Sequence, residues 1–301
     1  MVCHVGPIRR AWAVVHSHTE LPHRYIHANG VRLHYVEQGS GPLVILLHGF
    51  PDFWYCWRHQ IPALAAAGYR VVAPDLRGYN DSERPRHVEA YGLDTLAADV
   101  AALVHALGAE RATVVGHDWG GLVAWHVAMH HSGVVSSLVI MNAPHPRAFR
   151  RELTHNWAQK RRSWYIGLFQ LPWLPEALFA VGNRWLLRRV LRRGGPAHTE
   201  AELAQYLVAF AGPGAMTAAL HYYRALIRAP MRRPVTIECP TLLIWGLRDP
   251  YLLPALAEGT EAWVTTLERH DEPTARHWVQ HDAAASVNAR LLTFLSVTAA
   301  G

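Results

Sequence analysis

The first organised part of the chain alternates apolar and polar residues on both sides of a short turn. Residues 24–27 and 31–36 show this alternation, and Asn29-Gly30 lies between them. Asn-Gly favours the positive φ angles of a two-residue hairpin turn, so we predict a β-hairpin here. Residues 1–20 lack the apolar stretch and small-residue cleavage site of a signal peptide, and we expect a loose N-terminal extension.

Strand-like and helix-like segments then alternate along the chain. Apolar positions spaced three and four residues apart predict helices, and short continuous apolar runs predict strands that are buried on both faces. The alternation implies a mostly parallel sheet covered by helices, which is the α/β class. In chain order we predict a strand at 43–47, a helix at 57–67, a strand at 71–73, a helix at 95–107, a strand at 112–117, a helix at 122–130 and a strand at 135–141.

The alternation stops after the strand at 135–141. The next segment is helical in pattern, aromatic and rich in arginine, with prolines as breaks. Apolar runs at 241–245 and 262–267 predict two more strands, and 278–295 predicts a closing helix. An insertion between two parallel strands is well placed to act as a lid over a site at the strand ends. The predicted division is a core of 21–145 and 234–301 and a helical cap of 146–233.

The most informative motif is Gly116-His117-Asp118-Trp119-Gly120. It lies between a predicted strand and a predicted helix, which is the setting of a nucleophile elbow, a sharp turn that exposes one side chain. The outer glycines permit the close backbone approach of such a turn. Asp118 occupies the nucleophile position. A carboxylate is ionised at neutral pH without a base, and it suits attack on a saturated carbon, which leaves an ester for water to cleave.

A histidine and a second acid are expected to serve the water step. In a fold with this elbow the chain order is nucleophile, acid, histidine. Asp249 follows the predicted strand at 241–245 and His277 precedes the closing helix, so both lie where open α/β sheets bind ligands. We predict that His277 activates water and that Asp249 orients its imidazole. The position after the strand at 135–141 could also supply the acid, but it holds Asn142.

Two backbone N–H groups are candidates for an oxyanion hole. One belongs to Trp119, directly after the nucleophile, and the other belongs to Phe50, in the loop at 48–51 after an early strand. Donors at these positions would stabilise the negative charge that develops when water attacks the ester carbon of Asp118.

Composition narrows the functional classes. Half of the 301 residues are apolar and 17% are charged, so a large buried core is expected rather than disorder. The net charge is +6, Lys160 is the only lysine, and much of the arginine lies in 147–193. Such a segment could bind an anionic partner. Because no nucleic-acid-binding signature accompanies it, we interpret it as solvated helix faces and expect no nucleic acid partner.

Cysteine and histidine usage gives no sign of a cofactor. Cys3, Cys56 and Cys239 are too far apart for a disulfide framework or a paired metal site, which favours a reducing compartment, and we expect a cytoplasmic protein. The histidines show no metal-ligand spacing. No apolar run is long enough to cross a bilayer. We predict no metal and no cofactor, and a homo-oligomer remains open.

Five motifs resemble those of the epoxide hydrolases with an α/β-hydrolase fold. They are His48-Gly49-Phe50-Pro51, Asp75-Leu76-Arg77-Gly78-Tyr79, Gly116-His117-Asp118-Trp119-Gly120-Gly121, Asn142-Ala143-Pro144-His145-Pro146 and His277-Trp278-Val279-Gln280. In that family two lid tyrosines hydrogen-bond the epoxide oxygen. The segments around Tyr165 and Tyr223 resemble the two tyrosine motifs, which assigns this role to them. One departure is Arg276, where the family has a small residue; a buried cation there would lower the pKa of His277.

The resemblance implies an enzyme that converts an epoxide to a vicinal diol without a cofactor. Asp118 attacks an epoxide carbon while Tyr165 and Tyr223 support the oxygen, and water activated by His277 then cleaves the ester. The expected partners are a small hydrophobic epoxide and water. The residues expected to line the pocket are His48, Pro51, Trp54, Trp164, Phe169 and Trp278.

Other functions share parts of this pattern. A haloalkane dehalogenase has the same nucleophile and base, but that family usually has Asn or another polar residue where Phe50 stands. A fluoroacetate dehalogenase has an arginine beside the nucleophile, where this chain has Trp119. A non-catalytic ligand receptor on the same scaffold would not need the complete set of nucleophile, acid and histidine.

Overall fold

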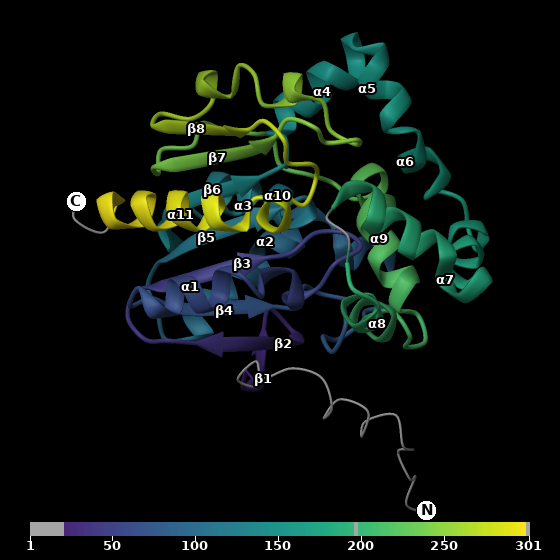
Figure 1. Ribbon diagram of the computed structural model, residues 1–301, viewed down its shortest axis with the longest axis horizontal. Coiled ribbons are helices and arrows are strands. Elements are labelled where there is room, and N and C mark those ends of the chain that lie inside the picture. The colour runs from purple at the N-terminus through teal and green to yellow at the C-terminus, as the bar shows by residue number, and fades with distance from the viewer. Residues whose placement is uncertain (1–20, 196–197, 299–301) are drawn as a thin grey trace, which may run out of the picture.

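The computed structural model describes residues 21–195 and 198–298, and the predicted extension at 1–20 lies outside them. The described strands form one eight-stranded sheet in the order β1-β2-β4-β3-β5-β6-β7-β8 (Figure 1). β2 pairs antiparallel with β1 and β4, and the other neighbours pair in parallel, which confirms the predicted fold class. The strands are β1 (His23–Ala28), β2 (Val31–Gln38), β3 (Leu43–Leu47), β4 (Arg70–Pro74), β5 (Ala112–His117), β6 (Val135–Met141), β7 (Thr241–Gly246) and β8 (Leu267–Glu272).

The turn between β1 and β2 is the predicted hairpin. Asn29 and Gly30 connect the two strands with φ angles of 47° and 75°. Both angles are positive, as a two-residue turn that follows the twist of the strands requires, and asparagine and glycine adopt them most readily.

Different helices cover the two faces of the sheet. α2 (Leu93–Ala106) and α3 (Trp119–His130) pack on one face, and α1 (Gln60–Ala66) and α11 (Ala284–Thr298) pack on the other (Figure 1). The sequence of β3 is apolar throughout because both of its faces are buried. Its residues alternate between the two hydrophobic clusters, because successive side chains of a strand point to opposite faces. Leu43, Ile45 and Leu47 belong to the α2 and α3 cluster, and Val44 and Leu46 belong to the α1 and α11 cluster.

Between β6 and β7 the chain leaves the sheet and forms a group of helices at one end of it (Figure 1). None of the helices in the described residues combines the length and apolarity needed to cross a membrane. The helices of the group are α4 (Pro146–His155), α5 (Trp157–Arg162), α6 (Trp164–Leu168), α7 (Leu174–Gly194), α8 (Glu200–Ala209) and α9 (Ala215–Arg228).

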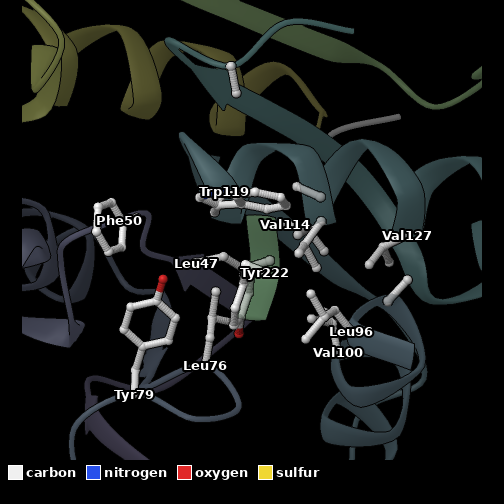
Figure 2. Packing of buried hydrophobic residues seen from close by; sticks show 14 of the residues in the cluster. Leu47, Phe50, Leu76, Tyr79, Leu96, Val100, Val114, Trp119, Val127 and Tyr222 are labelled. Atoms are coloured by element: carbon white, nitrogen blue, oxygen red, sulfur yellow. The ribbon is translucent and has the colours of Figure 1, made fainter. Parts of the chain in front are cut away.

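α9 joins these helices to the core. Its Tyr222 lies among core residues beside Leu76 and Trp119 (Figure 2). The ring centroids of Tyr222 and Trp119 are 5.4 Å apart, and the Tyr222 hydroxyl donates a 2.8 Å hydrogen bond to the carbonyl oxygen of Arg77. Burying an aromatic ring together with a satisfied hydroxyl fixes this helix firmly against the elbow helix α3.

Most predicted bounds differ from the structure by a few residues, and two predicted elements differ more. The strand expected at 262–267 is β8, which begins where that prediction ends. β8 lies at the edge of the sheet with most of its side chains exposed or half-buried, so apolar residues do not mark it. The helix expected at 278–295 is two helices, α10 (Val279–Asp282) and α11, interrupted at Ala283, whose φ and ψ are −129° and 41°.

Candidate active site

β5 and α3 hold Asp118 in a sharp turn. Its backbone angles, φ 51° and ψ −118°, are unusual for a residue with a side chain. A Cβ at Gly120 would collide with the carbonyl oxygen of Leu47, and a Cβ at Gly116 would collide with that of Gly120. The outer glycines therefore permit close packing of the turn, while the strained angle belongs to Asp118 itself. The Asp118 side chain remains 18% exposed.

The three predicted members of the catalytic set meet at this turn. His277 Nε2 lies 3.5 Å from Asp118 Oδ2, and His277 Nδ1 lies 2.7 Å from Asp249 Oδ2. His277 and Asp249 are buried. Because a carboxylate oxygen accepts hydrogen bonds, Nδ1 carries a proton, and Nε2 is the nitrogen that faces the nucleophile.

The charges in this set shift one another's protonation. Burial by itself lowers the pKa of His277, but the Asp249 and Asp118 carboxylates outweigh burial and raise the pKa to about 10. Burial likewise favours a raised pKa for Asp118, yet the hydrogen bond and charge of His277 hold the pKa of that carboxyl below its usual value. The resting site therefore contains an Asp118 anion beside an imidazolium, and removal of the Asp118 charge would weaken the hold of His277 on its proton.

The loop after β3 supplies a donor to the nucleophile. The Phe50 N–H donates to Asp118 Oδ1 at 2.8 Å. Gly49 makes this approach possible, because a Cβ there would overlap the Asp118 side chain. Trp119 is the first residue of α3, and N–H groups in the first turn of a helix have no acceptor within the helix. The Asp118 carboxylate thus has one oxygen held by the backbone and the other directed toward His277.

Asn142, at the end of β6, supports Asp249 in a way that the sequence did not reveal. Its Nδ2 donates to Asp249 Oδ2 at 2.8 Å, and its Oδ1 accepts the N–H of Gly246 at 2.9 Å. The N–H groups of Tyr251 and the residue after it donate to Asp249 Oδ1. Both oxygens of Asp249 therefore have partners that fix its orientation. Position 142, which could have supplied the acid, instead holds an asparagine that donates a hydrogen bond to the acid, Asp249.

Tyr165 of α6 and Tyr223 of α9 approach the nucleophile from the helical segment. Their ring centroids are 6.0 Å apart, and both side chains line the same cavity as Asp118. Burial is the main cause that raises the pKa of each phenol, and the charge of Asp118 raises both further. Both side chains therefore remain protonated and able to donate hydrogen bonds.

The cavity has a volume of about 530 Å³ and is lined by residues of the core and of the helical segment. Three of the predicted pocket residues, Trp164, Phe169 and Trp278, are part of its lining, and so is Phe50. The lining also contains Tyr251, whose ring centroid lies 5.2 Å from that of His277. A cavity of this size can enclose a drug-sized molecule.

Three predicted pocket residues lie outside the cavity lining. The side chain of His48 is buried, and its Nε2 accepts the N–H of Leu76 at 3.0 Å. Pro51 is also buried. Trp54 packs against the hydrophobic core, with its ring centroid 5.5 Å from that of His23. His48 and Pro51 belong to the loop that carries the Phe50 N–H, and none of the three residues lines the cavity beside Asp118.

Arginine is the unpredicted component of the cavity. Arg161 and Arg162 of α5 and Arg189 and Arg193 of α7 line it. In the part of the chain that the structure describes, no group of three His, Cys, Asp or Glu side chains is arranged to hold a metal ion. The charged groups that line the cavity are the Asp118 carboxylate, His277 and these four guanidinium groups.

Arg276, the departure from the family pattern, does not act as a buried cation. Its side chain is 35% exposed and pairs with Asp282, with Arg276 Nε and Asp282 Oδ2 3.2 Å apart. A partly hydrated and paired charge has little effect on its neighbour, and the pKa of His277 is raised rather than lowered.

The fold and the site define a known class of protein. A family model described as the alpha/beta hydrolase fold matches residues 42–284, which is more than half of the chain. The chain therefore belongs to the α/β-hydrolase fold family, as its motifs predicted.

Relatives narrow this membership further. The AB hydrolase superfamily protein YfhM of Bacillus subtilis (strain 168) is 39% identical over 277 residues, which cover 90% of this chain and 97% of that protein. Epoxide hydrolase 4 of Homo sapiens is 36% identical, over 89% of this chain and 76% of its own. The crystal structure of Bacillus megaterium epoxide hydrolase in complex with an inhibitor matches with a TM-score of 0.85 and 34% identity. The match covers 91% of this chain and 100% of that chain. Within the fold family, this chain is a member of the epoxide hydrolase group.

Proposed function

We propose that this protein hydrolyses an epoxide to a vicinal diol through a covalent ester on Asp118. The observation that carries the proposal is the position of the Asp118 carboxylate. It shares one cavity with His277 on the core side and with the phenols of Tyr165 and Tyr223 on the opposite side. A nucleophile, a base and two neutral donors around one space are the groups that ring opening followed by ester hydrolysis requires.

In the first step, Asp118 Oδ2 attacks an epoxide carbon and the carbon–oxygen bond of the ring breaks. Oδ1, which the Phe50 N–H holds, becomes the ester carbonyl oxygen. The released oxygen takes a proton from a phenol of Tyr165 or Tyr223. His277 restores that proton through solvent, because its pKa falls once Asp118 becomes an uncharged ester.

In the second step, neutral His277 takes a proton from a water molecule, and the resulting hydroxide attacks the Asp118 Cγ. The negative charge then develops on Oδ1, where the Phe50 and Trp119 N–H groups stabilise it. The intermediate collapses as the bond from Cγ to the substrate oxygen breaks, and the proton of the new hydroxyl passes to that leaving oxygen. The diol and the Asp118 carboxylate result, and His277 keeps the proton that it took from water. The hydrogen bond to Asp249 holds the imidazole with Nε2 toward the water throughout.

The helices at 146–233 act in this proposal as a cap domain over the core at 21–145 and 234–301. The core supplies the nucleophile and the base, and the cap supplies both phenols, so neither part contains a complete site.

Cys56 and Cys239 are free thiols, which fits a reducing compartment. We propose that the protein is located in the cytoplasm.

A single turnover in ¹⁸O-labelled water tests the covalent route. Because water attacks the Asp118 Cγ, the first turnover should place the label in Asp118 and leave the diol unlabelled. Label in the diol of the first turnover would show that water attacks the epoxide directly. Release of halide from bromoalkanes, with no diol from styrene oxide, would favour the haloalkane dehalogenase instead.

A variant of the base provides a second measurement. His277→Gln retains the nucleophile and lacks the base, so the ester should accumulate and add the mass of the substrate to the peptide that contains Asp118. Asp118→Ala is the matched control and should show no adduct under the same conditions. Absence of the adduct in folded His277→Gln, together with normal turnover, would contradict the proposed roles.

A further inference from the structure

The loop that carries Asp249, residues 247–253, which we call the acid loop, is held by a helix of the cap. Gln159 of α5 is fully buried, and its side-chain amide pairs with the acid loop through both of its polar atoms. Its Nε2 donates to the carbonyl oxygen of Tyr251 at 3.0 Å, and its Oε1 accepts the N–H of Leu253 at 2.9 Å. One amide thus binds a carbonyl and an N–H of the same backbone segment, which fixes the position of that segment.

The backbone that Gln159 holds is also the backbone that orients the acid. The N–H of Tyr251 donates to Asp249 Oδ1 at 2.7 Å, and the carbonyl oxygen of the same tyrosine accepts the hydrogen bond from Gln159. A second side chain of α5 acts at the other end of this turn, where Arg162 Nη1 donates to the carbonyl oxygen of Asp249 at 3.0 Å. Two residues of the cap therefore restrain the turn whose N–H groups bind the Asp249 carboxylate.

The loop that carries His277, residues 273–278, which we call the base loop, meets the end of another cap helix. The N–H of Trp278 donates at 3.1 Å to the carbonyl oxygen of Gly194, the last residue of α7. That carbonyl has no partner within the helix because it belongs to the last turn. A Cβ at Gly194 would lie 2.2 Å from an atom of the Trp278 ring, so glycine is what lets the helix end approach this closely.

Tyr251 connects the acid loop, the base loop and the cap. Its hydroxyl donates at 3.1 Å to the carbonyl oxygen of Val190, one turn before the end of α7. Its ring centroid lies 5.2 Å from that of His277, with an angle of 82° between the ring planes. A Cβ at Gly194 would also lie 2.8 Å from the Tyr251 ring. The cap thus holds both the backbone and the ring of the residue that packs against the imidazole.

We propose that the cap positions the catalytic acid and base, with Gln159 and Gly194 as positioning residues that act through the acid loop and the base loop. The proposal rests on the epoxide hydrolase function above and adds two residues that do not line the cavity. Asp118 is already ionised and attacks the epoxide without a base, whereas ester hydrolysis needs Nε2 of His277 directed at water. Weaker contacts between the cap and these loops therefore slow the second step and spare the first.

Gln159→Leu tests the contact with the acid loop, because it removes both polar atoms of the amide and leaves an apolar side chain of similar size. In single-turnover experiments with styrene oxide, we expect hydrolysis of the Asp118 ester to slow roughly 10- to 100-fold, as a small displacement of a catalytic group can cause. Alkylation of Asp118 should stay within about twofold of the wild-type rate. The ester should therefore accumulate, which mass spectrometry of the intact protein measures.

The pH profile of ester hydrolysis distinguishes positioning from a general loss of structure. The imidazole acts as a base only when it is neutral, so the rate rises as the pH passes the pKa of His277 in the ester. Asp249 raises that pKa through its charge and its hydrogen bond. A less firmly held Asp249 raises the pKa less, so the rise should move to lower pH in Gln159→Leu. The other titratable groups that face the imidazole are unchanged in this variant: Asp118, His117 and Tyr251.

Gln170→Leu is the matched control within the cap. The Gln170 amide also donates to backbone carbonyl oxygens, those of Ile166 at 3.2 Å and Tyr223 at 2.8 Å, and it joins the end of α6 to α9. Because these bonds lie within the cap, the rate and the pH profile of ester hydrolysis should stay as in the wild type. Any loss of activity should lie in ring opening, to which Tyr223 contributes. Equal slowing of ester hydrolysis in both glutamine variants would overturn the proposal.

Gly194→Ala tests the contact with the base loop independently, and it remains available if Gln159→Leu does not fold. The added methyl group would displace the rings of Trp278 and Tyr251, so ester hydrolysis should again slow roughly tenfold or more while alkylation continues. Gly167→Ala is its control, because Gly167 is exposed and open space lies where its Cβ would be. Both rates in Gly167→Ala should stay within about twofold of the wild-type rates.

The outcomes separate this proposal from the one on which it rests. Absence of diol from the wild type with terminal, internal and aryl epoxides, and of an adduct in His277→Gln, would contradict the epoxide hydrolase function itself. Normal ester hydrolysis in folded Gln159→Leu and folded Gly194→Ala, with an active wild type, would overturn only the positioning roles. Similar losses in alkylation and in ester hydrolysis would show that these contacts maintain the fold in general, and would likewise overturn the proposal.

Discussion

The proposed core and cap position their parts of the site by different physical means. Asp118 and Asp249 directly follow or closely follow the parallel strands β5 and β7, and His277 follows β8 after a short loop. The register of the parallel strands brings these strand ends together. Tyr165 and Tyr223 lie on α6 and α9, which are helices and contribute no strand to the described sheet. Strand register converts sequence order into geometry, whereas helix packing depends on side chains that meet only in the folded protein.

Removal of the two phenols of the cap should cause the largest loss of kcat among the variants that distinguish the cap from the core. Tyr165→Phe and Tyr223→Phe each remove a donor to the leaving oxygen, and we expect kcat to fall roughly 10- to 100-fold for each and about 10³-fold for both. Steady-state and single-turnover kinetics with styrene oxide measure the loss, which should lie in the ring-opening step.

Tyr222→Phe is the matched control for the phenols. Tyr222 precedes Tyr223 on α9, but its hydroxyl bonds to the carbonyl oxygen of Arg77 in the core. Its loss should lower the free energy of unfolding by about 1 kcal/mol and leave kcat within about twofold of the wild-type value. An equal loss of activity in Tyr222→Phe and Tyr223→Phe would indicate that cap packing, rather than a donor to the epoxide, determines the rate.

The difference between core and cap also decides how much could be predicted from the sequence. The elbow, the acid and the histidine were placed by motif and chain order, because a strand end leaves its residue little freedom. The apolar pattern failed at β8, whose edge position leaves most of its side chains exposed or half-buried. It could not show that Asn142 donates to Asp249, since that contact joins the ends of two strands 107 residues apart.

The cavity lining was less predictable still. The cavity arginines Arg189 and Arg193 directly follow the ion-paired Arg188 and Arg192 in sequence, so only the rotation of α7 about its axis separates the two pairs. The direction in which these side chains point cannot be worked out from the sequence by counting 3.6 residues per turn from the start of α7. Arg184 has a positive φ of 58°, which interrupts the regular 3.6-residue period. Residues of identical type thus acquire different surroundings through tertiary packing alone.

A smaller loss of activity is expected when the contact that orients Asp249 within the core is removed. Asn142→Gly removes the amide that donates to Asp249 Oδ2, and glycine tolerates the φ of 40° at this position. A less firmly held Asp249 orients His277 poorly, so we expect ester hydrolysis to slow about tenfold while alkylation of Asp118 continues. Accumulation of the Asp118 ester, measured by mass spectrometry during turnover, is the readout.

Asn80→Gly provides the comparison for that variant. Asn80 also has a φ of 40°, and its Nδ2 donates at 2.8 Å to Asp75, an acid outside the catalytic set. Asn80→Gly reproduces the change in backbone freedom and the loss of a side-chain hydrogen bond to a carboxylate, here a part-buried one, but it should not cause ester accumulation. Ester accumulation in both variants would mean that a general loosening of the fold, and not the orientation of Asp249, slows the second step.

The smallest effect on activity is expected at Asp52, which lies where the core meets the cap. Asp52 is fully buried and accepts hydrogen bonds from the N–H of Phe53 at 2.9 Å and from Trp278 Nε1 at 2.8 Å. The ring of Phe53 packs against Tyr206 of α8, with centroids 5.4 Å apart. Burial raises the pKa of Asp52 from 3.8 to about 7, against the opposing effect of these hydrogen bonds.

The direction of this pKa shift gives a test of stability in which catalysis serves as the control. Since the folded protein holds the Asp52 proton more tightly than the unfolded chain, the stability that the proton contributes is full below pH 3.8 and is lost as the pH rises through about 7. Asp52→Asn cannot ionise and should not lose it. Urea unfolding at about pH 4 and about pH 8 should therefore show the variant gaining a few kcal/mol relative to the wild type as the pH rises, with kcat within about twofold. A constant difference between the two proteins would mean that Asp52 stays ionised in the folded state, and that the junction of core and cap tolerates a buried charge.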